Sequence, residues 1–506
     1  MPATGQFSYA HGRATALETL LHQLFLRLDS ERRRSLTYLD TFDWRVHRAG
    51  FVLTRAGDDL ELSDRETGAV VTRAPATATN ELPAALHDRL AGTIAPRALL
   101  PVAVVTSSDV VLSARNGDDK TVARLIVSEA QVDHDGRRTP LIPRLSVLPL
   151  RGYDKQAARL TEQLTELPGV EAVTSSLFEE AVAAGGRQPD DYSSKLSLRL
   201  TRDSSTYDAA RLIYRTLLTA MRVNEAGVID DLDSEFLHDF RVAVRRTRSA
   251  LKELAGALPE ELEHRFREEF RWLGQVTTPT RDLDVYLLEF PAFRAVVGDA
   301  ADDLDHLHRL IASEQRRAQA KLRKALRSAR YRRLVDDWAR AVDAEDPSAG
   351  EGPIGGVPIG ATADTRISKV GRRVLRQGAE IDDSSAGERL HDLRKRCKEL
   401  RYLLEFFSSL YDSKVHGALV SALKGLQDNL GAFQDTQVQR HAVEGFAEQL
   451  VNDRDTSATA LLAVGRLVAA FDDRERQART EFADRFASFA GPKNRQRLEL
   501  LTEGRR

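Results

Sequence analysis

With 506 residues, the chain is long enough for two or three domains that each bury a core of their own. Apolar residues make up 42% and charged residues 30%, which is typical of globular proteins and excludes a disordered or membrane-embedded chain. The 74 lysines and arginines nearly balance 76 aspartates and glutamates, so any anion-binding site must be a local cluster of cations.

The cysteine content points to a reducing compartment. Cys397 is the single cysteine, which excludes an internal disulfide and leaves too few thiolates for a structural zinc site. The first twenty residues lack the basic start and apolar core of a signal peptide, and no apolar run reaches membrane-spanning length. We therefore expect a cytoplasmic protein that does not bind membranes.

Residues 1 to about 190 are predicted to form an α+β domain. Hydrophobicity alternates over short runs that begin near residues 51, 61, 102 and 121, as in half-buried antiparallel strands. The turn sequences GDD, ETG, NGDD and HDG between them fit hairpins. Helical periodicity is expected from Ala14 to Leu28 and again from Gln156 to Leu167.

Long helices dominate from about Ser204 onward, and Ser204 or Ser205 is a suitable N-cap for the first of them. The Gly- and Pro-rich stretch PSAGEGPIGGVPIGATAD, which ends at Asp364, interrupts the helices and predicts a flexible linker. The expected organisation is a domain over residues 1–195 and a helical domain over residues 196–506. The latter comprises a first repeat at about 204–345, a linker at 346–364 and a second repeat at about 365–490.

The strongest signal is an internal repeat on either side of this linker. LHDFRVAVRRTRSALKEL begins at Leu237 and LHDLRKRCKELRYLLEFF begins at Leu390, an offset of 153 residues. The same offset aligns FRWLGQVTTPTRDLDV, from Phe270, with LKGLQDNLGAFQDTQV, from Leu423. Two loops of equal length that keep one register indicate a duplicated helical unit.

Each copy predicts one amphipathic helix with a cationic side. At about 100° per residue, the cations of the first copy share an arc of about 80°. They are His238, Arg241, Arg245, Arg248 and Lys252. The second copy repeats the pattern with His391, Arg394, Lys398 and Arg401, although Glu405 replaces the fifth cation. The opposite stripes should be buried, and Cys397 belongs to one of them as a packed thiol rather than a nucleophile.

Flanking helices add further candidate cations. Arg271 and Lys424 share the repeat offset, and Arg215 and Arg372 correspond if the intervening loops differ by four residues. Asp282 and Asp435 also coincide, either to orient the basic side chains or as ordinary N-caps.

Two structural explanations compete with anion binding. Arginines and lysines on an exposed helix usually form only a solvated surface, but here few acidic residues occupy the i+3 and i+4 positions where pairing is expected. The two histidines lack companion ligands, so a histidine that donates to a phosphate oxygen fits better than a metal ligand. We expect no metal and no cofactor.

The motifs LHDFRVAVRRTR, LHDLRKRCKELRY, LQDNLG and RDLDV closely resemble the CHAD family, over roughly residues 204–490. This resemblance implies two pseudo-symmetric helical bundles around a basic groove that binds inorganic polyphosphate, often on polyphosphate granules. It assigns the anion-binding role to His238, Arg241, Arg245, Arg248, His391, Arg394, Lys398 and Arg401.

The N-terminal part resembles a CYTH domain, an antiparallel barrel-like fold known as the triphosphate tunnel. TYLDTFDWRVHRAGFVLTR, from Thr37, and ARLIVSEAQV, from Ala123, carry this partial resemblance. GQFSYAHG lacks the family's ExExK motif, and PRLSVLPL replaces a later acidic strand. Because metal-bound triphosphate needs several converging carboxylates, we expect a non-catalytic CYTH-like domain, with an unrelated α+β domain as the alternative.

The predicted function is therefore inorganic polyphosphate binding. The expected partners are inorganic polyphosphate itself and polyphosphate granules or polyphosphate-metabolising enzymes. One alternative is a CYTH-type, metal-dependent triphosphatase. The other is a nucleic-acid-binding module, which the near-neutral charge and scarce aromatic residues disfavour.

Overall fold

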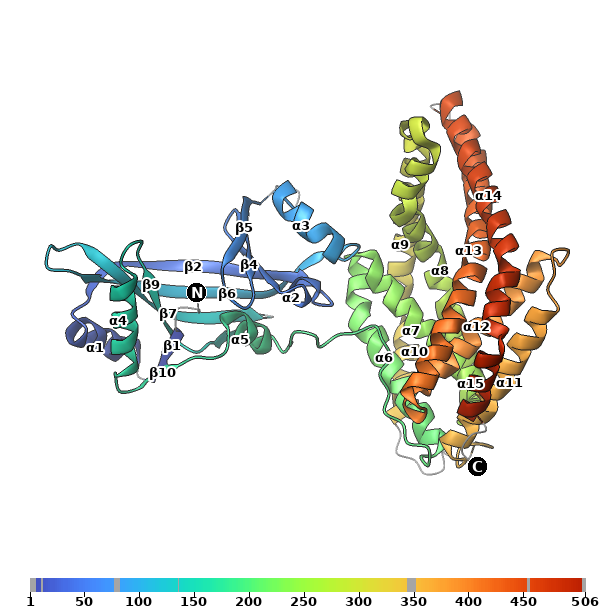
Figure 1. The fold of residues 1–506 in the computed structure, drawn as a ribbon, viewed down its shortest axis with the longest axis horizontal. Helices are drawn as coiled ribbons and strands as arrows, with labels where there is room; N and C mark the ends of the chain where they lie inside the picture. Colours follow the sequence, from blue (N-terminus) through green and yellow to red (C-terminus); the bar gives the residue numbers. More distant parts are fainter. Residues whose placement is uncertain are drawn as a thin grey trace. The chain divides into compact units, whose positions relative to one another are not determined.

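The computed structural model describes residues 6–10, 12–76, 82–134, 136–343, 352–452 and 456–502. The chain divides into two compact units, Met1–Ser193 and Ser194–Arg506 (Figure 1). Among the described residues, every helix is too short or too polar to cross a membrane.

The first unit is built on a ten-stranded antiparallel sheet. Its strands are β1 (Gln6–Tyr9), β2 (Arg27–Thr41), β3 (Phe51–Ala56), β4 (Asp59–Asp64), β5 (Val70–Pro75), β6 (Leu99–Arg115), β7 (Thr121–His134), β8 (Arg137–Pro140), β9 (Arg144–Pro149) and β10 (Val170–Ala172). They are ordered β10-β1-β9-β7-β6-β2-β3-β4-β5, and β8 pairs with β7. The predicted antiparallel α+β architecture is confirmed.

The helices of the first unit pack on separate parts of this sheet. They are α1 (Arg13–Gln23), α2 (Arg45–Arg48), α3 (Ala84–Ile94), α4 (Asp154–Thr165) and α5 (Leu177–Ala184). Residues of α1 and α4 form one apolar core with the sheet, α5 forms a second and α3 a third.

The expected helix from Ala14 to Leu28 is too long, because β2 already begins at Arg27. The first nine residues of β2 are all exposed. A strand that is exposed on both faces has no apolar alternation, and periodicity therefore missed it.

The second unit consists of helices and short 3-10 turns. Its α-helices are α6 (Thr206–Asp230), α7 (Ser234–Glu253), α8 (Glu260–Val297), α9 (Asp305–Leu326), α10 (Ala329–Asp343), α11 (Ile359–Ala379), α12 (Gly387–Phe406), α13 (Ser413–Val451), α14 (Ala458–Ala490) and α15 (Pro492–Thr502). The 3-10 turns are η1 (Gly298–Ala300), η2 (Asp302–Leu304) and η4 (Ser408–Leu410). Ser205 is the N-cap of α6, since its Oγ accepts a hydrogen bond from the backbone N–H of Asp208 at 3.0 Å.

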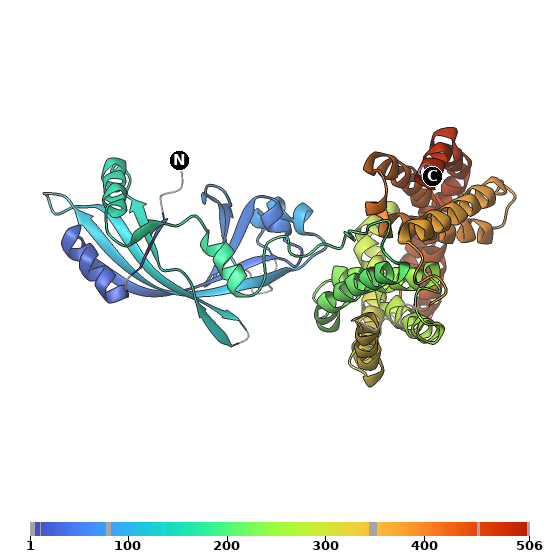
Figure 2. The same ribbon diagram turned by 90° about the horizontal axis from the view of Figure 1, so that it is seen from below.

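The predicted duplication is visible in the helix boundaries. Helices α6, α7, α8 and α9 begin 153 residues before α11, α12, α13 and α14, respectively. The continuous α14 takes the place of both α9 and α10. In both views the green-to-yellow first repeat lies beside the orange-to-red second repeat (Figures 1 and 2).

The repeats meet through reciprocal backbone hydrogen bonds. The N–H of Thr206 donates to the carbonyl of Val357, and the N–H of Ile359 donates to the carbonyl of Ser204, each at 2.8 Å. These donors and acceptors are related by the 153-residue offset, so the contact has pseudo-two-fold symmetry. A shared apolar core of α8, α9, α13 and α14 joins the repeats again.

The predicted linker is shorter than expected. Helix α11 begins at Ile359, inside the segment assigned to the linker, and Ile354 donates its N–H to the carbonyl of Gly256 at 3.0 Å. Residues 344–351 of this segment lie outside the described residues. The Gly and Pro content suggested flexibility, but the end of the segment is held by the first repeat.

Helices α7 and α12 bury the stripes that their periodicity predicts. Phe240, Val244, Thr247, Leu251 and Leu254 are buried in α7 and the turn that follows it. In the second repeat the buried stripe comprises Leu393, Cys397, Leu400, Leu404 and Phe407. Cys397 is buried, as predicted, and this burial raises the pKa of its thiol to about 12.

Candidate functional site

Cations of both repeats line one cavity of about 630 Å³ in the helical unit. Helix α7 contributes His238, Arg245 and Arg246, and α12 contributes Arg394, Lys398 and Arg401. The lining also includes two carboxylates, Asp239 of α7 and Glu405 of α12. Because their opposite stripes are buried, α7 and α12 both turn their polar sides toward this space. We call it the central cavity.

The cations of the central cavity differ in how they are neutralised. Arg394 forms an ion pair with Asp435 of α13 at 2.8 Å, and Arg401 pairs with Glu405 at 2.8 Å. The Arg245 guanidinium lies over the Tyr402 ring, 5.7 Å from its centroid. Within the described part of the chain, neither Arg245 nor Lys398 forms an ion pair. The cavity therefore holds two cations without a carboxylate partner.

The surroundings of Lys398 destabilise its charged form. Burial, followed by repulsion from Arg394 and Arg245, lowers the pKa of Lys398 to about 8. Asp435 opposes this shift but does not cancel it. An anion in the cavity would favour the charged form of Lys398 and relieve the repulsion between the cations.

Three predicted cations of α7 lie outside the described lining of the central cavity. Arg241 donates hydrogen bonds to the Gly274 carbonyl and to two threonines of α8, Thr277 and Thr278. The Arg248 guanidinium lies against Gly274, and Lys252 forms an ion pair with Glu399 of α12. Burial lowers the pKa of Arg241 to about 10. These three side chains join helices instead of facing the cavity.

The two histidines, expected to act alike, have different surroundings. His238 lines the central cavity. Nδ1 of His391 lies 2.5 Å from Oε1 of Gln434 on α13, and His391 is absent from the described cavity lining. Because an amide oxygen only accepts, the Nδ1 of His391 is the donor in this hydrogen bond.

The flanking candidates lie on other surfaces. Arg271 pairs with Glu268 and Arg215 pairs with Asp343, each at 2.8 Å, whereas Lys424 and Arg372 are exposed. None of these four predicted cations belongs to the described cavity lining.

The predicted correspondence of Arg215 with Arg372 is wrong. Since α6 and α11 keep the offset of 153 residues, the position related to Arg215 is Ser368, and the one related to Arg372 is Thr219. The four-residue difference in loop length that this correspondence requires does not exist, because α7 and α12 also keep the offset of 153 residues.

The N-cap interpretation of Asp282 and Asp435 is also wrong, since both lie far inside long helices. Asp435 pairs with Arg394, and Asp282 faces Arg241, the residue related to Arg394 by the repeat. Each repeat therefore places an aspartate beside the arginine at the corresponding position of its own copy. The alternative role, orientation of the basic side chains, fits this geometry.

Sequence reasoning missed a pair of charged contacts between the repeats. Arg246 pairs with Glu405 at 2.7 Å, and Lys252 pairs with Glu399. By the repeat offset, Arg246 corresponds to Glu399 and Lys252 to Glu405. Two related positions thus carry cations in the first copy and carboxylates in the second. This reversal of charge can be read from the aligned copies. Because opposite charges attract, it favours contact of a first repeat with a second repeat over contact between two identical repeats.

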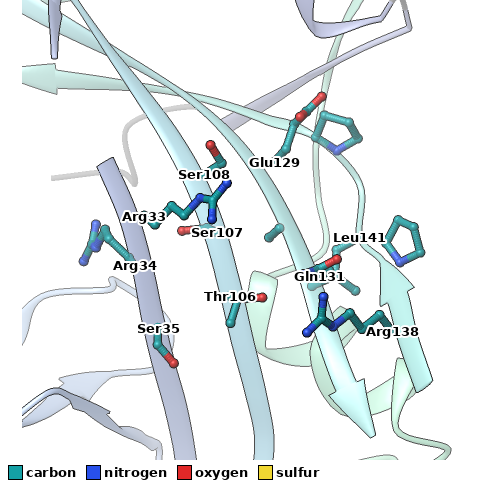
Figure 3. A pocket seen from close by; sticks show the side chains of 13 residues that line it. Arg33, Arg34, Ser35, Thr106, Ser107, Ser108, Glu129, Gln131, Arg138 and Leu141 are labelled. Carbon is teal, nitrogen blue, oxygen red and sulfur yellow. The ribbon is translucent and has the colours of Figure 1, made fainter. Parts of the chain in front are cut away.

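The first unit contains a larger pocket, of about 840 Å³, on β2, β6, β7 and β8 (Figure 3). Its lining includes the hydroxyl residues Ser35, Thr106, Ser107 and Ser108, and the arginines Arg33, Arg34 and Arg138. Glu129 is the one carboxylate of this described lining. The described residues contain no group of three or more His, Cys, Asp or Glu side chains placed to hold a metal ion.

Comparison with known proteins identifies the helical unit. Residues 212–444, from α6 into α13, match the model of the CHAD domain family. The uncharacterized proteins Rv2226 and MT2285, from two Mycobacterium tuberculosis strains, are each 29% identical over 241 residues. These matches cover 45% of this chain and 43% of each relative, so the chain spans less than half of the relatives' length.

Two solved structures are similar to part of the chain. The crystal structure of the CHAD domain from the plant Ricinus communis is 28% identical, with a TM-score of 0.47, and covers 57% of this chain and 94% of that chain. PptA from Streptomyces chartreusis is 16% identical, with a TM-score of 0.44, and covers 56% of this chain and 99% of that one. The family match over residues 212–444 shows that the helical unit contains a CHAD domain.

Proposed function

We propose that the helical unit binds inorganic polyphosphate in the central cavity. The observation that carries this proposal is the convergence of cations from both repeats on one space, among them Arg245, Arg394, Lys398 and Arg401. Guanidinium groups bind phosphate oxygens through paired, charge-assisted hydrogen bonds, and lysine binds them as a point charge. His238 adds a donor when its ring N–H faces the ligand.

A linear polyanion suits this cavity better than a compact ligand. The cations come from two helices, so successive phosphates can contact different side chains. Each neutralised phosphate releases condensed counterions, which makes affinity fall with salt by a slope of about 0.7 per contact, by analogy with single-stranded nucleic acid. Four contacts give a slope near 3 in a plot of log affinity against log salt, on this estimate.

A pair of variants on one helix tests the proposal. Lys398→Glu introduces a negative charge into the cavity, whereas Lys395→Glu makes the same change at an exposed residue of α12 that pairs with Asp392. We expect K398E to abolish polyphosphate binding in the central cavity in a titration with chains of defined length, and K395E to retain it. Equal affinities for both variants, or an affinity that salt does not change, would disprove the proposal.

Nucleic acid is the main competing ligand. Tyr402 is the one aromatic residue of the described cavity lining, and it is buried beneath Arg245, so bases have no exposed ring on which to stack. Polyphosphate should therefore displace single-stranded RNA from the intact chain at much lower concentration than the reverse. The opposite order would favour a nucleic-acid-binding function.

The proposal extends to the first unit, which we take to be CYTH-like and without triphosphatase activity. Metal-assisted hydrolysis of a triphosphate requires several carboxylate oxygens at one site, and the described lining of its pocket offers only Glu129. The full-length chain should release no phosphate from tripolyphosphate with Mg²⁺ or Mn²⁺. Phosphate release that Glu129→Gln removes would overturn this part.

Association with polyphosphate granules follows from the same ligand. A fluorescent fusion of the full chain should gather on granules in cells that make polyphosphate. The fusion that carries K398E should gather on granules less than the unchanged fusion, whereas the K395E fusion should gather on them to the same extent.

A further inference from the structure

A second basic surface lies on the first repeat, outside the central cavity. Between Gln315 and Leu334, on α9 and α10, the chain has nine arginines and lysines and no acidic residue. At about 100° per residue, five exposed cations from the C-terminal half of α9 and its C-cap share an arc of about 140°. We call these residues the outer basic surface: Arg316, Arg317, Lys321, Lys324 and Arg327. The opposite side of α9 is buried, as at Leu322 and Leu326.

Few carboxylates neutralise the outer basic surface. Arg317 pairs with Glu314 at 2.6 Å, and Arg327 lies 3.9 Å from Asp230. Within the described ranges of the chain, Arg316, Lys321 and Lys324 form no ion pair. Like charges on adjacent helical turns repel one another, so this surface carries a cost that a bound anion would remove.

The corresponding segment of the second repeat is not predominantly basic. The segment that corresponds by the repeat offset, Val468 to Ala487 on α14, holds four arginines and five acidic residues. The same fold can therefore carry a charge-balanced helix at this place. The absence of acidic residues between Gln315 and Leu334 is therefore a property of the first copy and is not required by the bundle.

The outer basic surface and the central cavity lie on different sides of the first repeat. The ring of Phe240, on the buried stripe of α7, lies 6.4 Å from the ring of Tyr331, on the buried side of α10. Helices α7 and α10 thus face each other across the core. The polar side of α7 borders the cavity, and the exposed side of α10 and the adjoining α9 points away from it.

We propose that the outer basic surface binds a second stretch of phosphate polyanion, which makes the helical unit bivalent; this rests on the proposed function of the cavity. Arg316 and Arg327 are about 16 Å apart along the helix axis, at 1.5 Å per residue, so one short chain can contact the whole row. The aromatic residues of α9 and α10, Tyr331 and Trp338, are both buried. With no ring exposed for base stacking, the surface favours bare polyphosphate over nucleic acid.

The experiment counts binding sites on the full chain by calorimetry with a short, defined-length polyphosphate. The wild-type protein should bind two molecules, and Lys321→Glu/Lys324→Glu should bind one with the affinity of the cavity. Both substituted residues are exposed, so folding should be preserved. The matched control is Lys155→Glu/Arg159→Glu, which makes the same charge change on exposed positions of α4 and should keep both sites.

The two proposals fail in distinguishable ways. A wild-type stoichiometry of one, or two sites retained in K321E/K324E, overturns the outer site while the cavity proposal stands. If Arg245→Gln/Lys398→Gln still binds two polyphosphate molecules, the cavity proposal is wrong. The number of molecules that K321E/K324E binds then still tests the outer site independently. If duplex DNA displaces polyphosphate from R245Q/K398Q more effectively than polyphosphate displaces DNA, the assigned ligand class is wrong.

Discussion

The low pKa of Lys398 predicts that polyphosphate binding weakens as pH rises. In the free protein the pKa of Lys398 is about 8, because the side chain is buried beside Arg394 and Arg245. A bound polyanion raises this pKa, so the complex keeps a proton that the free protein loses above pH 8. One pH unit above the free pKa, only about a tenth of the lysine is charged, and the affinity should be about tenfold lower than near pH 7.

The charged groups around Lys398 define the control. Arg245 faces it from α7, Asp435 from α13, and Arg394 from its own helix. Lys398→Arg leaves these neighbours in place and replaces the lysine by a side chain that stays charged over this range. The tenfold decrease should disappear in this variant.

Calorimetry measures both the affinity and the proton uptake. Titrations of long-chain polyphosphate near pH 7 and near pH 9, in two buffers of different ionisation enthalpy, should report net proton uptake by the wild-type protein at the higher pH. K398R should take up less. A wild-type affinity that is equal at both pH values, or a K398R affinity that falls as steeply as the wild type, would refute the reasoning.

Two further predictions concern the assembly of the helical unit. In a double-mutant cycle measured by urea unfolding, Arg246→Ala and Glu405→Ala should show a coupling free energy of about 1 kcal/mol, since this ion pair is largely shielded from water. Additive effects of the two substitutions would show that the ion pair does not stabilise the contact between the repeats. A Cβ added at Gly227 would lie 2.3 Å from the Phe236 ring, so Gly227→Ala should cost about 1–3 kcal/mol of stability. Gly425→Ala, also in a helix but with nothing within 4 Å, should raise the melting temperature slightly, and equal effects of the two alanines would contradict this packing.

The sequence by itself determined the duplication and the orientation of its key helices. A gapless offset of 153 residues reflects equal element lengths, and α6 to α9 and α11 to α14 keep it. The buried stripes of α7 and α12 follow from helical periodicity, because burial of apolar side chains fixes which face turns inward. The antiparallel architecture of the first unit was likewise readable, except at the exposed start of β2.

Only the tertiary structure decided which cations share a space. Arg241, Arg245 and Arg248 lie on one side of α7, yet only Arg245 faces the cavity. Arg241 donates hydrogen bonds to α8, and the Arg248 guanidinium lies against Gly274 of the same helix. A helical-wheel projection gives the direction of each side chain around its own helix axis. It does not say which other helix lies in that direction. The same limit hid the ion pairs of Arg246 and Lys252, whose partners lie more than a hundred residues away on α12.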